Sequence, residues 1–158
     1  MRGRMNDVKS YVDPLQIGDV MTGESVGVVI NSTSGQYAIG DYVAAHAGWQ
    51  SLLVVSDDSP KLMKVDLKHG TLSAHLGVVG MPGRTAYFGL LEVGKPKPEE
   101  TLVVAASSGA VGSVVGQIAK IKGLLVIGIA GGPEKCRYVR DELKFDACVD
   151  YKARQPSR

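Results

Sequence analysis

The sequence predicts an α/β fold built from two domains. In the second half, continuous apolar runs alternate with helical segments in the order strand, helix, strand, helix, strand. In the first half, short apolar runs are separated by turn residues, and the chain of 158 residues is long enough for two small domains. Strands buried on both faces give unbroken apolar runs, so the second half predicts a parallel sheet covered by helices. We place the domains at residues 1–80 and 81–158.

The first domain is predicted to be a small, barrel-like β domain. Its apolar runs at residues 26–30 and 52–55 are expected to be strands, and the segment 57–60 ends the second of these. Between them, residues 37–43 place a Gly40-Asp41 turn just before another strand. Residues 71–76 form either a short helix or a connection. Trp49 is the only tryptophan of the chain, and it suits a core position and a place beside a cleft about equally well.

The second domain opens with a helix over residues 84–93 that has Ala86, Leu90 and Val93 on one side. The prolines that follow cannot continue it. A strand at 101–106, a helix at 111–122, a strand at 124–129, a helix at 133–143 and a strand at 147–149 complete the pattern. Gly123 is expected to close the 111–122 helix.

The turn between the 101–106 strand and the next helix is the first candidate site. It reads Ser107-Ser-Gly109-Ala-Val-Gly112, a dinucleotide-binding pattern in which serine replaces the first glycine. A glycine turn before a helix N-terminus suits a pyrophosphate, because the backbone approaches closely and the N–H groups are free. Gly109, Ala110, Val111 and Gly112 are therefore the candidate pyrophosphate residues. The alternative is that these glycines serve only the packing of the helix on the sheet.

The end of the second strand indicates which nucleotide is bound. A site for NAD carries Asp or Glu about 20 residues beyond the glycines, where it binds the ribose 2′-hydroxyl. Here the chain has Ala130, Gly131 and Gly132 instead, so no carboxylate repels a 2′-phosphate. Lys135 follows at the start of the next helix and favours a phosphate. The pattern predicts NADP(H), although Lys135 could also be an ordinary surface lysine.

Composition excludes several other classes. A net charge of +2, without a basic block, gives no reason to expect nucleic-acid binding. No apolar run is long enough to cross a membrane, and the polar start suggests a cytoplasmic protein. Cys136 and Cys148 are expected to be free, partly buried thiols rather than a disulfide. They and the widely spaced His46, His69 and His75 form no recognisable metal set, so we expect no metal.

Three segments together resemble a known family: residues 80–87, 105–120 and 131–136. They are similar to the zinc-independent medium-chain reductases, and among these to the NADP-dependent alkenal/one oxidoreductases. The resemblance implies a GroES-like domain followed by a Rossmann domain. It also implies hydride transfer from NADPH to the carbon–carbon double bond of α,β-unsaturated aldehydes and ketones. Hydrogen bonds, and not a metal ion, would then stabilise the enolate.

The resemblance also implies roles for individual residues. Met81 and Thr85 would line the nicotinamide side of the cleft. Gly131, Lys135 and Tyr151 would surround the adenosine 2′-phosphate. The catalytic residues are left unassigned, and the whole protein is expected to be a homodimer.

The two ends of the chain depart from the family pattern. The resemblance begins inside a motif and stops after the third strand of the second domain, so we expect a partial GroES-like barrel and the first half, β-α-β-α-β, of a Rossmann domain. For this reason we expect weak NADPH binding and little turnover. Two alternatives stay open: an NADPH-dependent quinone reductase, and an inactive nucleotide-binding remnant.

Overall fold

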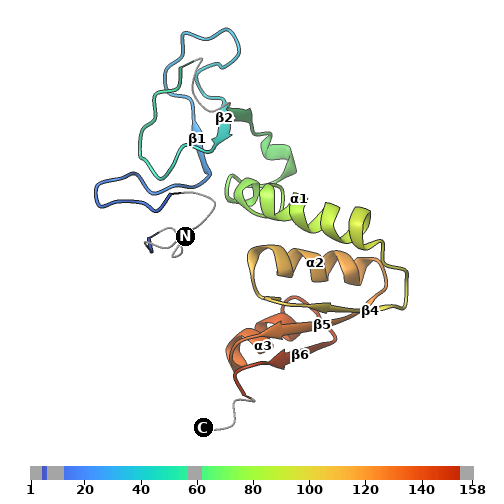
Figure 1. The fold of residues 1–158 in the computed structure, drawn as a ribbon. Coiled ribbons are helices and arrows are strands. Elements are labelled where there is room, and N and C mark those ends of the chain that lie inside the picture. The colour runs from blue at the N-terminus through green and yellow to red at the C-terminus, as the bar shows by residue number, and fades with distance from the viewer. Residues whose placement is uncertain (1–4, 7–12, 57–61, 154–158) are drawn as a thin grey trace. The chain divides into compact units, whose positions relative to one another are not determined.

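The structure is a computed structural model that describes residues 5–6, 13–56 and 62–153. The chain divides into two compact units, Met1–Leu76 and Gly77–Arg158, which are treated separately below. The first contains an antiparallel sheet and the second a parallel sheet with helices (Figure 1). The predicted α/β class is confirmed.

The sheet of unit 1 has the order β1-β2-β3. Its strands are β1 (Ser25–Val28), β2 (Tyr42–Ala45) and β3 (Met63–Lys64). β1 pairs antiparallel with β2, with Val26 opposite Ala44, and β2 pairs antiparallel with β3. Two short 3₁₀ helices follow: η2 (Leu67–His69) and η3 (Ser73–Leu76). The second of these resolves the choice at residues 71–76 in favour of a short helix.

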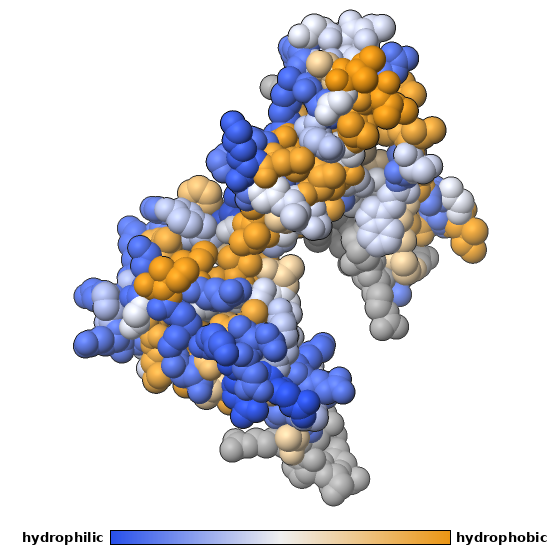
Figure 2. Space-filling view, turned by 180° about the vertical axis from the view of Figure 1, so that it is seen from behind, coloured by the Kyte–Doolittle hydropathy of each residue, from blue (hydrophilic) through white to orange (hydrophobic). Residues whose placement is uncertain are grey.

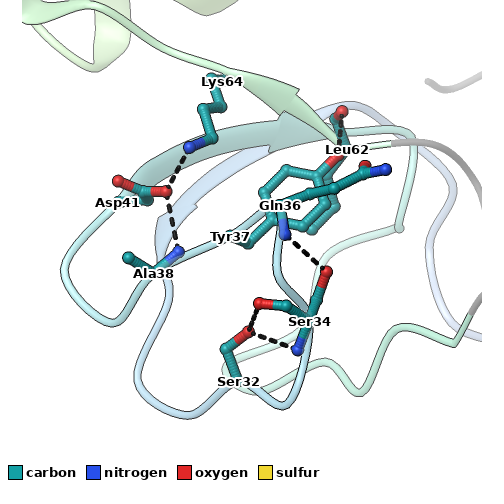
Figure 3. Close-up of polar contacts among 8 residues, drawn as sticks. All are labelled: Ser32, Ser34, Gln36, Tyr37, Ala38, Asp41, Leu62 and Lys64. Atoms are coloured by element: carbon teal, nitrogen blue, oxygen red, sulfur yellow. Dashed lines mark hydrogen bonds and ion pairs between the residues drawn. The ribbon is translucent and has the colours of Figure 1, made fainter.

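A polar network holds the loop before β2 (Figure 3). Asp41 Oδ2 accepts from Lys64 Nζ at 2.7 Å and from the Ala38 backbone N–H at 3.0 Å. The Lys64 ammonium, and then the Ala38 N–H, lower the pKa of Asp41. The Tyr37 hydroxyl donates to the Leu62 carbonyl at 2.9 Å, so the loop is tied to the residue before β3. These contacts are largely exposed, and each contributes little to stability.

One expectation for unit 1 is wrong, and one of the two positions left open for Trp49 is excluded. Residues 52–55 form no strand; the strand after β2 is Met63–Lys64 instead. Leu52 and Val54 are 71% and 93% exposed, so neither side chain packs in a core. Trp49 is 61% exposed and is therefore not a core residue. Figure 2 colours hydrophobic residues orange and shows several groups of them on the surface of the face drawn.

Unit 2 contains a three-stranded parallel sheet of order β4-β5-β6. Its elements, in chain order, are α1 (Met81–Tyr87), η4 (Phe88–Gly94), β4 (Thr101–Val104), α2 (Ala110–Ile121), β5 (Leu125–Ala130), α3 (Pro133–Asp141) and β6 (Ala147–Asp150). α1 packs against α2, while α2 and α3 pack against the strands. The predicted strand–helix alternation is confirmed, with boundaries shifted by one or two residues. Gly123 follows α2 at φ 79°, a left-handed conformation that glycine adopts readily.

The core of unit 2 lies between the helices and the parallel sheet. Val126 of β5 and Val139 of α3 are fully buried, and Phe145 packs in the same cluster. Gly116 of α2 faces the Phe145 ring so closely that an added Cβ would lie 1.8 Å from a ring carbon. Glycine at position 116 therefore lets α2 approach the sheet.

The first helix of unit 2 differs from its prediction. From Phe88 the backbone widens into a π-helical segment, and the Lys95 N–H donates to the Leu90 carbonyl five residues back at 2.9 Å. The wider turn changes which residues share a face. Ala86 and Leu90 are buried as expected, but Val93 is 82% exposed, so its predicted place on the apolar side is wrong.

Asp146 connects α2 to the sheet just before β6. Its carboxylate accepts from Lys120 Nζ at 2.7 Å and from the Val126 backbone N–H at 2.6 Å. The Lys120 contact first, and the Val126 N–H second, lower the pKa of Asp146. This charged group satisfies a strand N–H next to the core.

Candidate nucleotide-binding site

The residues proposed for the pyrophosphate and the 2′-phosphate lie in the segments that follow the three parallel strands. In the registers of the sheet Val104 lies opposite Gly128, and Ala130 lies opposite Asp150, so all three carboxyl ends share one edge. The turn after β4, the Gly131–Gly132 turn after β5 and Tyr151 after β6 follow directly. In open α/β sheets this edge is where ligands bind.

The turn after β4 places the backbone for α2. Ala106 has φ 49°, and its carbonyl accepts from the Gly109 N–H at 2.8 Å. Gly109 is the N-cap of α2 and provides no side-chain hydrogen bond. The N–H groups of Ala110, Val111 and Gly112 lie in the first turn, where a helix has no acceptors of its own. This first turn can therefore hold an anion.

Gly112 has a packing role that the glycine pattern alone did not show. An added Cβ would lie 2.5 Å from the Ala106 carbonyl oxygen and 3.1 Å from Ser107 Cα. A side chain at position 112 would thus push the helix away from the turn that precedes it. Gly112 therefore has a packing role at the turn before α2, whether or not the turn binds a pyrophosphate.

Ser107 was not singled out from the sequence as a functional residue. It is fully buried, and both its backbone N–H and its hydroxyl donate to the Ile129 carbonyl at 3.1 Å. The turn after β4 is therefore fastened to the end of β5. The sequence could have indicated this role, because Ser107 stands at the first glycine position of the dinucleotide-binding pattern and brings a hydroxyl that glycine lacks.

Gly131 and Tyr151 are in contact. A Cβ on Gly131 would lie 2.6 Å from the Tyr151 hydroxyl oxygen and 2.8 Å from Cζ, so the ring edge covers the glycine. The Tyr151 N–H donates to the Ala130 carbonyl at 3.2 Å, which fixes its backbone beside β5. Tyr151 as a whole is 60% exposed. Two of the three residues expected around the 2′-phosphate thus lie together.

Asp150 lies beside the Gly131–Gly132 turn, and sequence reasoning missed it. Its Oδ1 accepts from the Gly132 N–H at 2.8 Å and from the Lys152 N–H at 3.0 Å. These two backbone donors hold the pKa of Asp150 below its usual range. Gly132 has φ 99° and is the N-cap of α3, so the carboxylate fixes the turn that leads into the helix. The sequence could have indicated Asp150, because this acid directly follows the predicted strand at 147–149.

Lys135 lies in the first turn of α3, on the exposed surface. It follows the Gly131–Gly132 turn by three residues, so its backbone lies near the same sheet edge as that turn. Helix N–H groups and a nearby ammonium are a donor set suited to a phosphate.

Met81 and Thr85 form a second pair, one turn apart on α1. The Thr85 hydroxyl donates to Met81 Sδ at 3.4 Å, and Met81 is 51% exposed. Gly83, between them, is buried so tightly that a Cβ would meet the Val78 carbonyl. The start of α1 is therefore packed closely while its Met81–Thr85 side faces outward.

Within residues 5–6, 13–56 and 62–153, no three His, Cys, Asp or Glu side chains lie close enough together to hold a metal ion. No helix in this part of the chain is both long and apolar enough to cross a membrane.

Residues 1–65 match the family model described as the N-terminal domain of oxidoreductase. The chain is 50% identical over 153 residues to the NADPH-dependent curcumin reductase of Escherichia coli, covering 97% of this chain and 44% of that protein. The chain is thus similar, over nearly its whole length, to an oxidoreductase of the family that its motifs resemble. The resemblance found in its motifs is confirmed.

Two further relatives agree. The 2-alkenal reductase (NADP⁺-dependent) of Nicotiana tabacum is 40% identical over 156 residues, which cover 98% of this chain and 45% of that protein. The solved structure of CurA from Vibrio vulnificus in complex with NADPH is 51% identical, with a TM-score of 0.81, covering 97% of this chain and 45% of that one. The chain thus spans less than half the length of the relatives it matches, in keeping with a partial GroES-like unit and half a Rossmann domain.

Proposed function

We propose that the chain binds NADPH at the carboxyl edge of β4-β5-β6 and serves the reduction of the carbon–carbon double bond of α,β-unsaturated aldehydes and ketones. The observation that carries the proposal is the acid-free turn after β5. Gly131 and Gly132 stand where an NAD site has a carboxylate, with Lys135 and Tyr151 beside them. The names of the relatives, a curcumin reductase and an NADP-dependent 2-alkenal reductase, support the same chemistry.

Each part of the nucleotide has a proposed set of donors. The N–H groups of Ala110, Val111 and Gly112 would hold the pyrophosphate, with Gly109 giving the backbone room. Lys135 would pair with the 2′-phosphate, while the Tyr151 ring and Gly131 form the wall beside it. Met81 and Thr85 would face the nicotinamide end. When bound, NADPH supplies the hydride.

The proposed residues concern the choice of nucleotide, not the chemical step. Asp150 lies at the end of β6, where its Oδ1 accepts two backbone N–H groups, and not at the end of β5, where an NAD site carries its acid. The enolate formed in such a reduction needs a hydrogen-bond donor, and no catalytic residue is assigned to that role.

The test is a calorimetric titration of the purified chain with NADPH and NADH. Replacing Lys135 with Gln should weaken NADPH binding about tenfold, since one charge-assisted phosphate contact is lost, and leave NADH unchanged. Lys122→Gln, at the C-cap of α2, is the matched control and should change neither. Equal affinity of the unaltered chain for the two nucleotides would contradict the proposal.

Turnover tests the substrate class. NADPH oxidation followed with an enal, an enone and a quinone separates the alternatives. Consumption with the enal or enone supports the proposal, and consumption with the quinone alone replaces it by quinone reduction. Binding without any turnover identifies the chain as a nucleotide-binding remnant.

Assembly and location complete the proposal. A homodimer follows the resemblance to the alkenal/one oxidoreductases, and sedimentation equilibrium tests it. Free Cys136 and Cys148 thiols suit a reducing compartment, so we place the protein in the cytoplasm. Cell fractionation tests that placement.

A further inference from the structure

Cys136 and Cys148 are the only cysteines in the chain, and the fold brings them together. Cys136 lies in the first half of α3 and Cys148 in the middle of β6, twelve positions apart in sequence. The Cys148 thiol donates to Cys136 Sγ at a sulfur–sulfur distance of 2.9 Å. Both thiols are free. A disulfide needs the sulfurs about 0.9 Å closer than this.

The two elements are held at this spacing by the rest of the unit. α3 packs against β5 and β6, and Val139, one turn after Cys136, is fully buried in the core. Cys148 lies opposite Gly128 in the sheet. An added Cβ at Gly128 would meet both Ser107 Oγ and Val139 Cγ1, so the packing is tight on this side of the sheet. The thiols therefore meet because the core fixes their backbones.

We propose that Cys136 and Cys148 form a reversible intramolecular disulfide under oxidation by hydrogen peroxide. The peroxide oxidises one thiol to a sulfenic acid and releases one water. The sulfur of the other thiol then attacks the sulfenic sulfur, the S–S bond forms and a second water leaves. The two thiols lose two electrons in total, and the peroxide is reduced to water.

The environment of the two thiols makes their first oxidation by peroxide slow. Burial, and then the hydrogen bond with Cys136, raise the pKa of Cys148 to about 11, so at neutral pH its thiolate is scarce. Cys136 is 8% exposed and Cys148 is half-buried. Once either sulfur is oxidised, however, its partner is already in contact, and closure is faster than any reaction with an outside thiol.

The disulfide would join α3 to β6, the two elements that carry Lys135 and lead to Tyr151. It closes a short loop through Leu143 and Phe145, both of which are core residues. The oxidised unit 2 should therefore unfold at a higher urea concentration than the reduced one, and dithiothreitol should reverse the shift. This outcome does not depend on nucleotide binding.

The test treats the folded chain with peroxide in the presence of dimedone, which traps sulfenic acids, and measures intact mass. The wild-type chain should lose about 2 Da as a monomer and take up little dimedone. Cys136→Ser and Cys148→Ser should each lose this product and accumulate the dimedone adduct on the remaining sulfur. Wild-type chain that keeps both thiols, forms disulfide-linked dimers or traps dimedone as the single variants do would overturn the proposal.

Discussion

The two units of this chain differ most in where their apolar side chains lie. Among the described residues of unit 1, the buried hydrophobic residues are Ala44 and Ala45, whereas unit 2 has a contiguous cluster around Val126, Val139 and Phe145. Unit 1 exposes Ile17, Leu52 and Val54. Apolar transfer from water is the main favourable term in folding. Unit 2 therefore contains the larger part of the core found in the described structure, and it is also the unit that holds the candidate nucleotide site.

The largest loss of unfolding free energy is expected at Gly116, where α2 contacts the core through a glycine. Gly116→Val would drive its side chain into the Phe145 ring, and unit 2 should lose about 3 kcal/mol or more of unfolding free energy. Gly89→Val is the matched control, because an added Cβ there meets nothing within 4 Å. Urea unfolding followed by circular dichroism measures both. A similar loss for the two variants would remove the packing argument.

A single chemical change made in both units should give two different results. Val126→Ala removes two methyl groups from a fully buried site in β5 and should cost about 2 kcal/mol. Val54→Ala makes the same change where the side chain is 93% exposed, and should stay within about 0.5 kcal/mol. If Val54→Ala destabilised the chain as much as Val126→Ala, the contrast between the units would be wrong. The comparison uses the same urea titration.

Asp146 should have a smaller effect that depends on pH. Its folded pKa is lowered, so the stability it provides is present above the unfolded pKa of about 3.8 and is lost as the pH falls through the folded value. Asp146→Asn should cost about 1 kcal/mol at pH 7, because the Lys120 charge and the Val126 N–H lose a carboxylate partner. The difference between variant and wild type should shrink below pH 4. A constant difference down to pH 2 would contradict this account.

The difference between the units also determines how much could be predicted from the sequence. Unit 2 was predictable because its runs at 101–106 and 124–129 are continuously apolar in sequence, and its core forms among neighbouring elements of the chain. The run at 52–55 looks similar in sequence, but it forms no strand here, since an apolar run specifies a strand only where a partner and a core receive it.

The candidate site was predictable in position but incomplete in detail. The glycine turn and the acid-free end of β5 follow from residue type and spacing alone. Ser107, Asp150 and the contact between Cys136 and Cys148 depend on which backbone groups the sheet register brings together. The exposure of Val93 depends on a π-helical segment, which no apolar periodicity of 3.6 residues predicts.

The measurement that tests the central claim most directly is a two-dimensional amide NMR titration with adenosine 2′,5′-bisphosphate. The account predicts shifts at the N–H groups of Ala110, Val111 and Gly112, at the Gly131–Gly132 turn and at Tyr151, with β1 and β2 unchanged. Adenosine 5′-monophosphate should shift the Gly131–Gly132 turn much less. Shifts confined to unit 1, or equal shifts with the two nucleotides, would contradict a 2′-phosphate site at the carboxyl edge of β4-β5-β6.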